Sequence, residues 1–411
     1  MARLIFVNRF FFPDHSATSQ ILSDLTFHLA AGGRDIHVVT STQTYTDPKT
    51  SLPARETING VHVHRVAATK FGRDGLVGRA LDYSSFYASA FQMLLKIAEP
   101  NDAIIAETDP PLVSVPALHA ARRRRARLVN WLQDIYPETA AALGVPLLGG
   151  SVGRTLALLR NRSLRQAQAT VVVGELMARR VEALGAPVKR VHVIPNWCND
   201  DTIKSLEPAG NPLRAAWRLQ AKFVVSYSGN LGWAHDYETV LEAADRLRNN
   251  SRILFLMIGG GKRFEELQRA VKARGLEDLF RFMPYQDQSV LPHSLAVADV
   301  HWLSLYPQLE GLIVPSKFYG MAATGRPIVM IGDPNGELGM LIQRHDCGAV
   351  ITPGEWSALA ATLERWLGDP SIVAGMGARA RQMLQDHFSR RQALSRWIDL
   401  CDQLHRESVR F

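Results

Sequence analysis

Short apolar runs alternate along this chain with longer segments in which apolar residues recur every three or four positions. Runs of this length are typical of buried strands, and the longer spacing is typical of helices that bury one face. In the first half we therefore predict strands at 3–10, 35–41, 61–67, 103–107, 127–134, 170–174 and 191–197. We predict helices at 19–31, 84–97 and 112–124, and one further helix before each of the last two strands. Strands and helices in this order form a parallel sheet with helices on both faces.

The alternation stops at residues 195–212 and then begins again. The interrupting segment contains three prolines and a glycine, which is typical of a linker. Beyond it we predict strands at 222–230, 252–261, 279–284, 298–305, 326–332 and 348–353, and helices at 237–249, 263–274, 356–369 and 388–411. The predicted fold class is α/β, with two Rossmann-like doubly wound domains at 1–197 and 198–385 that face each other across a cleft. Residues 386–411 are predicted to form a helix that crosses back to the first domain.

Composition is compatible with a soluble enzyme of two domains. The chain has 411 residues, of which 46% are hydrophobic and 21% are charged. No apolar run approaches the roughly 20 residues that span a bilayer. The apolar start is interrupted by Arg9 and no small-residue cleavage site follows, so we interpret it as a strand. The three cysteines have no metal-ligand spacing, which favours a reducing, cytoplasmic location.

The net charge of +8 is concentrated in the first half of the chain. Residues 1–200 carry 23 Lys and Arg against 16 Asp and Glu, and the remainder is nearly balanced. Such a surface can be a solvated face, a nucleic-acid site or a contact with anionic lipid. No nucleic-acid motif accompanies the charge, so nucleic acid is the weakest of the three. The candidate lipid contacts are Arg122–Arg125, Arg127, Arg154, Arg160, Arg162 and Arg165.

The segment LEGLIVPSKFYGMAATGRPIVMIG carries the most distinctive chemistry. Glu310 follows a predicted strand, and Lys317 stands at the start of a predicted helix. A helix N-terminus offers unpaired N–H groups and a partial positive charge, and a lysine adds a full charge. The pair therefore suits a phosphorylated ligand. The alternative is a buried helix with a satisfied glutamate and a surface lysine.

Two glycine-bearing turns follow strands of the second predicted domain. The first contains Gly229, Asn230 and Gly232 and leads to His235, and the second contains Gly259 and Gly260. Glycines at a strand's carboxyl end allow phosphates to approach the backbone. Together with Lys317 they predict a nucleotide-diphosphate site. The alternative is that these glycines only serve tight turns.

These motifs resemble the donor-binding half of family 4 glycosyltransferases of the GT-B fold. SGNLGWAHDYETVLEAA followed by EGLIVPSKFYGMAATGRPIV carries the resemblance, which is strongest to bacterial exopolysaccharide and O-antigen transferases of the colanic-acid and N-acetylfucosamine transferase group. NWLQDIYPETAAALG resembles their acceptor-side motif and VIPNW their linker, so the likeness covers nearly the whole chain.

The resemblance implies roles for individual donor-side residues. Family members generally hold the donor diphosphate with an Arg and a Lys, and here these positions are Asn230 and His235. Lys317, with Ser316 beside it, is the expected substitute for the missing positive charge. Glu310 followed by Gly311 matches the first of the family's paired glutamates, which contacts the transferred sugar. The second is absent, because the matching positions hold Phe318 and Gly320.

On the acceptor side the resemblance implies a histidine where this chain has Gln133, beside Asp134. A family glycine pair is replaced by Ser16 and Ala17, next to His15. The implied catalytic residues are Glu310, Lys317 and Asp134.

The resemblance implies retaining transfer from a UDP- or GDP-linked sugar to a lipid-linked glycan at the inner face of the cytoplasmic membrane. No metal or other cofactor is expected, since Lys317 can neutralise the leaving diphosphate. Two alternatives stay open. One is a sugar-nucleotide epimerase on the same fold, and the other is a catalytically silent nucleotide-binding subunit, which Asn230, His235 and the missing glutamate would favour.

Overall fold

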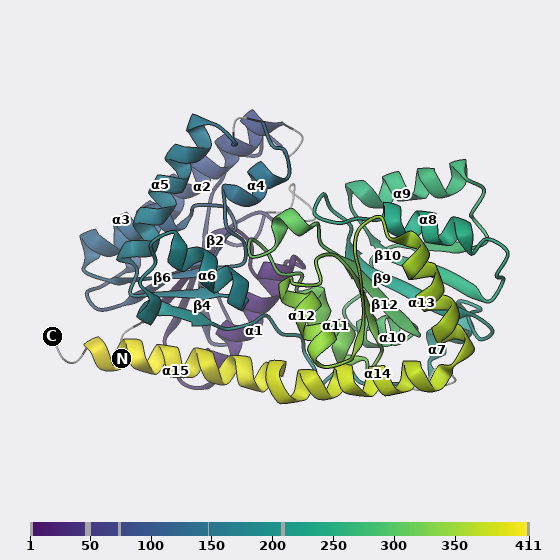
Figure 1. Ribbon diagram of the computed structural model, residues 1–411. Coiled ribbons are helices and arrows are strands. Elements are labelled where there is room, and N and C mark those ends of the chain that lie inside the picture. Colours follow the sequence, from purple (N-terminus) through teal and green to yellow (C-terminus); the bar gives the residue numbers. More distant parts are fainter. Residues whose placement is uncertain (1–2, 46–50, 73–74, 147, 207–209, 409–411) are drawn as a thin grey trace. The chain divides into compact units, whose positions relative to one another are not determined.

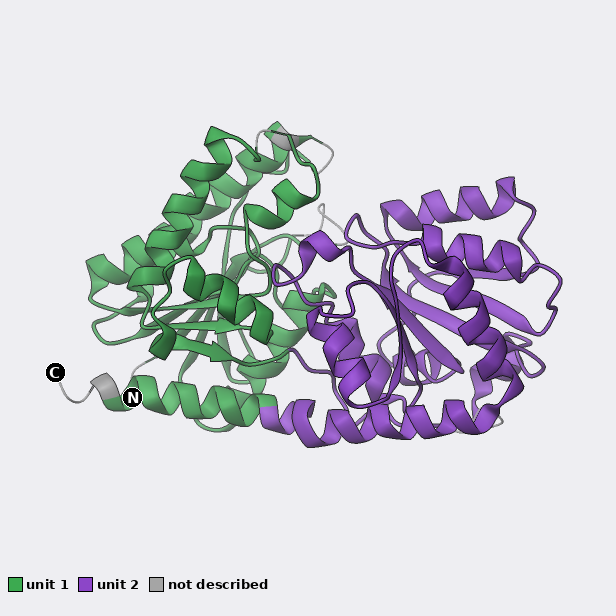
Figure 2. Ribbon diagram, in the orientation of Figure 1, with its two compact units in different colours: residues 1–195, 393–411 green, residues 196–392 purple. Residues whose placement is uncertain are grey.

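The chain folds into two compact units, seen in a computed structural model that describes residues 3–45, 51–72, 75–146, 148–206 and 210–408 (Figures 1 and 2). Unit 1 contains Met1–Pro195 and Ala393–Phe411, and unit 2 contains Asn196–Gln392. The first change of unit thus follows Pro195, where we placed it after Trp197. The second lies within α15 (Arg390–Ser408), so residues 386–392 belong to unit 2.

Unit 1 is built on an eight-stranded sheet in the order β3-β4-β2-β1-β5-β6-β7-β8. All neighbours pair in parallel except β3 and β4. The strands are β1 (Leu4–Val7), β2 (Ile36–Ser41), β3 (Arg55–Ile58), β4 (Val61–Val66), β5 (Ala103–Ala106), β6 (Arg127–Leu132), β7 (Ala169–Val172) and β8 (Val191–Val193). The helices are α1 (Ala17–Ala31), α2 (Leu76–Ile97), α3 (Ser114–Arg124), α4 (Glu138–Ala142), α5 (Ser151–Gln166) and α6 (Glu175–Ala183), and a short 3-10 turn covers Val188–Arg190.

One apolar core of unit 1 lies between the central strands and helices α2 and α3. Ile5 and Ile104 are fully buried on the sheet, and Phe86 and Leu94 of α2 pack in the same apolar cluster. All four residues of β1 and of β5 are buried, as expected for central strands covered on both faces.

Besides the short helix α4, which was not predicted, two elements of unit 1 differ from the sequence prediction. The antiparallel strand β3 was not predicted because its residues are polar and half-exposed, yet Asn59 and Gly60 join it to β4 with positive φ angles of 48° and 82°. Asn-Gly is a strong hairpin signal that the apolar pattern does not include. Helix α2 begins at Leu76 rather than residue 84, since its first turns expose residues such as Val77 and lack an apolar stripe.

Arg160 is not a surface residue, so its assignment as a lipid contact is wrong. Its guanidinium forms an ion pair with Glu138 at 2.6 Å and donates to the Tyr136 carbonyl at 3.3 Å. The residue is 4% exposed, because it lies on the face of α5 that packs toward the core of unit 1. The free-energy cost of burying this cation is offset by its carboxylate partner. The ion pair also ties α5 to the start of α4.

Unit 2 is built on a six-stranded parallel sheet in the order β11-β10-β9-β12-β13-β14. The strands are β9 (Phe223–Asn230), β10 (Ile253–Gly260), β11 (Phe280–Met283), β12 (Val300–Ser304), β13 (Ile328–Ile331) and β14 (Gly348–Ile351). The helices are α7 (Pro212–Ala216), α8 (Glu238–Arg246), α9 (Lys262–Ala273), α10 (Leu291–Leu295), α11 (Lys317–Ala323), α12 (Glu337–Arg344), α13 (Trp356–Gly368) and α14 (Pro370–Met383).

Helix α14 was not predicted, although its start carries a clear signal. Pro370 occupies the first turn, and the Asp369 side chain accepts a hydrogen bond from the Ser371 N–H at 3.0 Å. Such a proline and cap are typical of helix starts. The rest of α14 is rich in small residues, so it lacks the strong apolar stripe on which the prediction relied.

Each sheet has one place where the strand order reverses. In unit 1 it lies between β1 and β5, and in unit 2 it lies between β9 and β12. Ligands of open parallel sheets bind at the carboxyl ends of the strands at such a point. We therefore expect the predicted site residues at the carboxyl ends of the strands beside these two reversals.

Candidate active site

The carboxyl ends of β9 and β10 approach each other through glycines. Gly229 and Gly259 are register partners with φ angles of 128° and 131°. A Cβ atom on Gly259 would lie 2.2 Å from the Gly229 carbonyl oxygen, and one on Gly261 would lie 2.3 Å from Asn230 Oδ1. Close packing therefore accounts by itself for the presence of glycine at positions 259 and 261. At Gly229 the missing Cβ leaves room for a neighbouring side chain, since a Cβ atom there would lie 3.7 Å from Lys317 Nζ.

Lys317, the first residue of α11, lies against this edge. Its Nζ donates to the Tyr227 hydroxyl and to the Asn230 carbonyl, the latter at 3.3 Å, and it lies 4.1 Å from the centroid of the Tyr227 ring. Among the described residues no carboxylate forms an ion pair with it. Burial lowers the pKa of Lys317 to about 7. A half-buried ammonium without a counterion is suited to an anionic ligand.

His235 lies beside Lys317 and is neutral without a ligand. Its Nδ1 donates to the Ser304 carbonyl at 2.5 Å, because a carbonyl can only accept. Burial, followed by the nearby charge of Lys317, lowers the pKa of His235 to about 3. The imidazole is 9% exposed and thus no surface group.

Glu310 follows β12 and reaches the first turn of α12. Its Oε2 accepts the Glu337 N–H at 3.0 Å, whereas its Oε1 is buried without a hydrogen-bond partner among the described residues. A Cβ atom on Gly336 would lie 2.2 Å from Oε1, so any other residue there would displace the Glu310 carboxylate. Burial raises the pKa of Glu310 to about 7. The unsatisfied oxygen can accept a hydrogen bond from a ligand hydroxyl.

The other predicted donor-side residues lie on the same loops of unit 2. Gly232 is in the loop after β9, where a Cβ atom would meet Asn230 Nδ2 at 3.6 Å. Gly260 ends β10, Gly311 turns the chain after Glu310 with a φ of 71°, and Ser316 precedes α11 without a side-chain cap.

The predicted acceptor-side residues lie in unit 1 and fall into two groups. Gln133 and Asp134 follow β6, and the Gln133 N–H donates to Thr108 Oγ1 at 3.2 Å. Burial, then the charge of Asp109, raises the pKa of Asp134 to about 7. His15 and Ser16 precede α1, where the Ser16 N–H donates to Asp14 at 2.8 Å and His15 is exposed.

Three residues of the unit 2 edge were not predicted. Tyr227 accepts from Lys317 and donates to the Asn230 carbonyl at 2.8 Å, so it holds the turn and the ammonium together. Tyr285 is 62% exposed and follows β11, and a Cβ atom on Gly260 would lie 3.2 Å from its ring. Arg263 donates to Tyr306 at 2.8 Å and forms an ion pair with Glu238. Of these three residues only Tyr285 had a signal in the sequence, because it is an aromatic residue just after a predicted strand.

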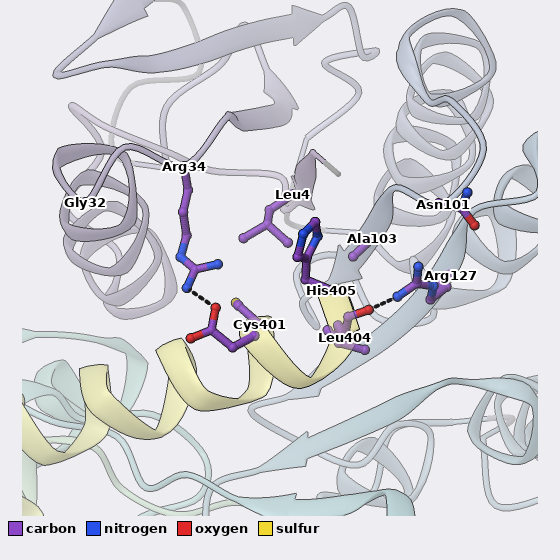
Figure 3. A pocket seen from close by; sticks show the side chains of 10 residues that line it. Leu4, Gly32, Arg34, Asn101, Ala103, Arg127, Cys401, Leu404 and His405 are labelled. Atoms are coloured by element: carbon purple, nitrogen blue, oxygen red, sulfur yellow. Dashed lines mark hydrogen bonds and ion pairs between the residues drawn. The ribbon is translucent and has the colours of Figure 1, made fainter. Parts of the chain in front are cut away.

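A cavity of about 140 Å³ lies elsewhere, under the amino ends of the unit 1 strands (Figure 3). It is lined by the starts of β1, β5 and β6 and by the last turns of α15. Arg34 pairs there with Asp402 at 2.7 Å, and Arg127 donates to the Leu404 carbonyl. Both arginines thus dock α15, and the cavity lies away from the predicted site residues.

Within the described residues, every helix is too short or too polar to span a bilayer. No group of three or more His, Cys, Asp and Glu side chains in that part of the chain could hold a metal ion.

Comparisons with known proteins agree with this geometry. Residues 17–197 match the glycosyl transferase 4-like domain, and residues 213–383 match the glycosyl transferases of group 1. WcaI of Escherichia coli strain K12, named as a colanic acid biosynthesis glycosyl transferase, is 26% identical over 370 residues, which is 86% of this chain and 89% of WcaI. WbjE of Pseudomonas aeruginosa, named as a glycosyltransferase, is 25% identical over 79% of this chain and 80% of its own.

The fold is also that of solved glycosyltransferase structures. HepE of Anabaena, crystallised with UDP-glucose, superposes with a TM-score of 0.74 at 16% identity over 98% of this chain and all of HepE. The two matched domains lie in tandem, one in each unit, and the predicted family and α/β fold class are confirmed. The chain is a family 4 glycosyltransferase of the GT-B fold.

Proposed function

We propose that the protein transfers a sugar from a UDP- or GDP-linked donor to a polyprenyl-diphosphate-linked glycan, with retention of configuration, in cell-surface polysaccharide synthesis. The observation that carries the proposal is the Lys317 ammonium, which lies over the β9 turn without a carboxylate partner among the described residues. Charge develops on the leaving diphosphate during transfer, and a preorganised cation stabilises it. The naming of WcaI as a colanic acid biosynthesis glycosyl transferase supports polysaccharide synthesis, and the HepE complex with UDP-glucose supports a nucleotide-sugar donor.

The other residues have roles that follow from their geometry. Glu310 Oε1, which is buried without a partner, accepts a hydroxyl of the transferred sugar. Tyr285 is exposed beside the Gly260 turn and offers a ring on which the base can stack. Asp134 receives the acceptor, and His15 and Gln133 of unit 1 belong to the same acceptor side. Because Lys317 supplies the positive charge, we expect no metal requirement.

A donor panel tests the proposal. Purified protein is incubated with UDP- and GDP-linked sugars, with and without a farnesyl-diphosphate-linked monosaccharide. We expect one donor to raise the unfolding temperature, since binding to the folded state stabilises it. We also expect transfer only when the acceptor is present, at a rate that EDTA does not change.

The two alternatives give other results in the same panel. Interconversion of the nucleotide sugar without acceptor would identify an epimerase. Binding without transfer or hydrolysis for any donor would identify a silent subunit.

We further propose that the protein is cytoplasmic and peripheral to the inner membrane face, through the exposed face of α5. Leu158 and Leu159 are 64% and 41% exposed there. Arg154, Arg162 and Arg165 are also exposed on this helix. Exposed leucines among arginines are typical of helices that lie on anionic membranes.

Replacing Arg154, Arg162 and Arg165 by Gln should weaken sedimentation with anionic vesicles about a hundredfold. Each cation near such a surface contributes about 1 kcal/mol, and about 1.4 kcal/mol is a factor of ten. Binding of the unaltered protein should also fall as salt shortens the screening length. The matched control replaces three other exposed cations of unit 1, Arg179, Arg180 and Lys189. Equal losses in both variants would mean that only net charge matters, and no sedimentation of unaltered protein at low salt would end the membrane proposal.

A further inference from the structure

A buried cation lies at the strand-order reversal of unit 1, and the proposed function gives it no role. Arg9 follows β1, the strand between β2 and β5, and is 5% exposed. Its backbone is fixed on both sides, because its N–H donates to the Asp109 carbonyl at 2.5 Å and its carbonyl accepts the Ser41 N–H at 3.0 Å. Arg9 is therefore held where an open parallel sheet presents ligands.

The guanidinium of Arg9 has aromatic neighbours but no carboxylate partner. It lies 5.3 Å from the ring centroid of Phe10 and 5.4 Å from that of Tyr83 on α2. Among the described residues it forms no ion pair. Of its three nitrogens, Nε alone is fully buried without a hydrogen-bond partner in that part of the chain, so the Nη atoms form the side that a ligand can reach.

The aromatic contacts offset only part of the cost of burying this cation. A ring attracts a cation but does not replace the hydrogen bonds that the N–H groups lose when they leave water. Arginine cannot lose its proton to relieve this cost, in contrast to lysine or histidine. An anion with two oxygens can accept two parallel N–H bonds from a guanidinium. The Arg9 side chain is therefore suited to bind a phosphate or a carboxylate.

The charges around Arg9 favour an anion. Arg79 is exposed on α2 and Asp109 follows β5, and both act on the Tyr83 hydroxyl together with Arg9, so two cations accompany one acid. Burial, followed by the charge of Asp109, raises the pKa of Tyr83 to about 12. Its hydroxyl therefore stays protonated and can donate to an anion as well. The other acids of this edge, which do not act on Tyr83, are Glu107 and Asp134.

We propose that Arg9 binds a phosphate group of the acceptor and thereby selects a phosphate-linked glycan. This inference rests on the proposed transfer reaction, because it names the part of the acceptor that unit 1 recognises. Only β5 separates β1 from β6 in the sheet, so the ends of these two strands lie about 10 Å apart at the usual strand spacing. A glycan whose phosphate contacts Arg9 can thus extend one sugar toward Asp134, which receives the reacting hydroxyl.

Two acceptors that differ only in their phosphate groups test the role of Arg9. One is the farnesyl-diphosphate-linked monosaccharide of the donor panel, and the other is the farnesyl glycoside of the same sugar. Arg9→Gln loses hydrogen bonds to a charged group, so KM for the first acceptor should rise about ten- to a hundredfold, whereas kcat/KM for the second should stay within about threefold. Arg9→Lys keeps the charge without the planar fork and should lose less. The control Arg179→Gln, exposed on α6, should change neither.

Inorganic pyrophosphate tests the same guanidinium without any transfer. Lys317→Ala removes the cation of the donor side, so a rise in unfolding temperature that pyrophosphate still causes in this variant reports an anion site elsewhere. Adding Arg9→Gln should abolish that rise, and adding Arg9→Lys should only reduce it. UDP carries the diphosphate of the donor and should bind Arg9→Gln as tightly as it binds the unaltered protein.

Four outcomes decide the inference. Equal losses with both acceptors would mean that Arg9 only supports the packing of Phe10 and Tyr83. Weaker UDP binding by Arg9→Gln would assign the guanidinium to the donor. No effect of pyrophosphate on Lys317→Ala, or an effect that survives Arg9→Gln, would overturn the anion site even if the kinetics cannot be measured. A protein that transfers to neither acceptor but shows the Arg9-dependent rise would keep the anion site and refute the proposed transfer.

Discussion

Replacing Lys317 by alanine is expected to lower kcat about a hundred- to a thousandfold while leaving the protein folded. The ammonium is the one positive charge that contacts the β9 turn, through the Asn230 carbonyl, in the described part of unit 2. Loss of one preorganised donor to developing negative charge costs this much in other enzymes. Rates of transfer under saturating donor and acceptor measure the effect.

The control for this variant is Lys272→Ala, an exposed lysine in the last turn of α9. It removes the same charge from unit 2 and should leave kcat unchanged. Circular dichroism and the unfolding temperature establish that both variants fold. Turnover of folded Lys317→Ala within a few-fold of the unaltered protein would refute the role of Lys317.

The sequence predicted all six strands of the second unit because their signals are local, whereas helices α7, α10, α12 and α14 were not predicted. Each strand of unit 2 is a short apolar run, and Ile328–Ile331 and Val300–Ser304 are fully buried in the structure. In unit 1 the same rule failed at β3, where polar residues pair at an edge and burial no longer marks the strand. The Asn59-Gly60 turn would have identified that hairpin.

The site was predictable only where one short motif carried it. Lys317 and Gly229 were identified from their own segments, but Tyr227, which contacts Lys317, lies 90 positions away. Contacts of that kind depend on which strands become neighbours, and no local pattern records this. The prediction that Arg160 contacts lipid was wrong for the same reason, since its partner Glu138 lies on another helix.

Donor affinity is expected to weaken as pH rises above neutrality, because Lys317 must carry a proton when the diphosphate binds. Burial sets the pKa of Lys317 at about 7 in the ligand-free protein, and a bound dianion raises that pKa. Below pH about 7 the ammonium is already formed, so the dissociation constant should be flat. Above it, binding must take up a proton, and the constant should rise about tenfold per pH unit until the pKa of the complex is reached.

His235 is the other residue whose protonation could make donor affinity depend on pH. Its pKa of about 3 without ligand means that protonation at neutral pH would cost far more than protonation of Lys317. We therefore expect His235→Gln to keep the pH dependence. Lys317→Arg should flatten it, because arginine stays charged over the whole range. The reverse pattern would assign the proton to His235.

Calorimetry of donor binding at about pH 8, in buffers with different ionisation enthalpies, measures the proton directly. Unaltered protein and His235→Gln should each take up about one proton, and Lys317→Arg close to none. A dissociation constant that stays the same from mildly acidic to alkaline pH, with no proton uptake, would mean that Lys317 is charged before the donor arrives. In that case the burial that lowers its pKa in the ligand-free protein would have no part in donor recognition.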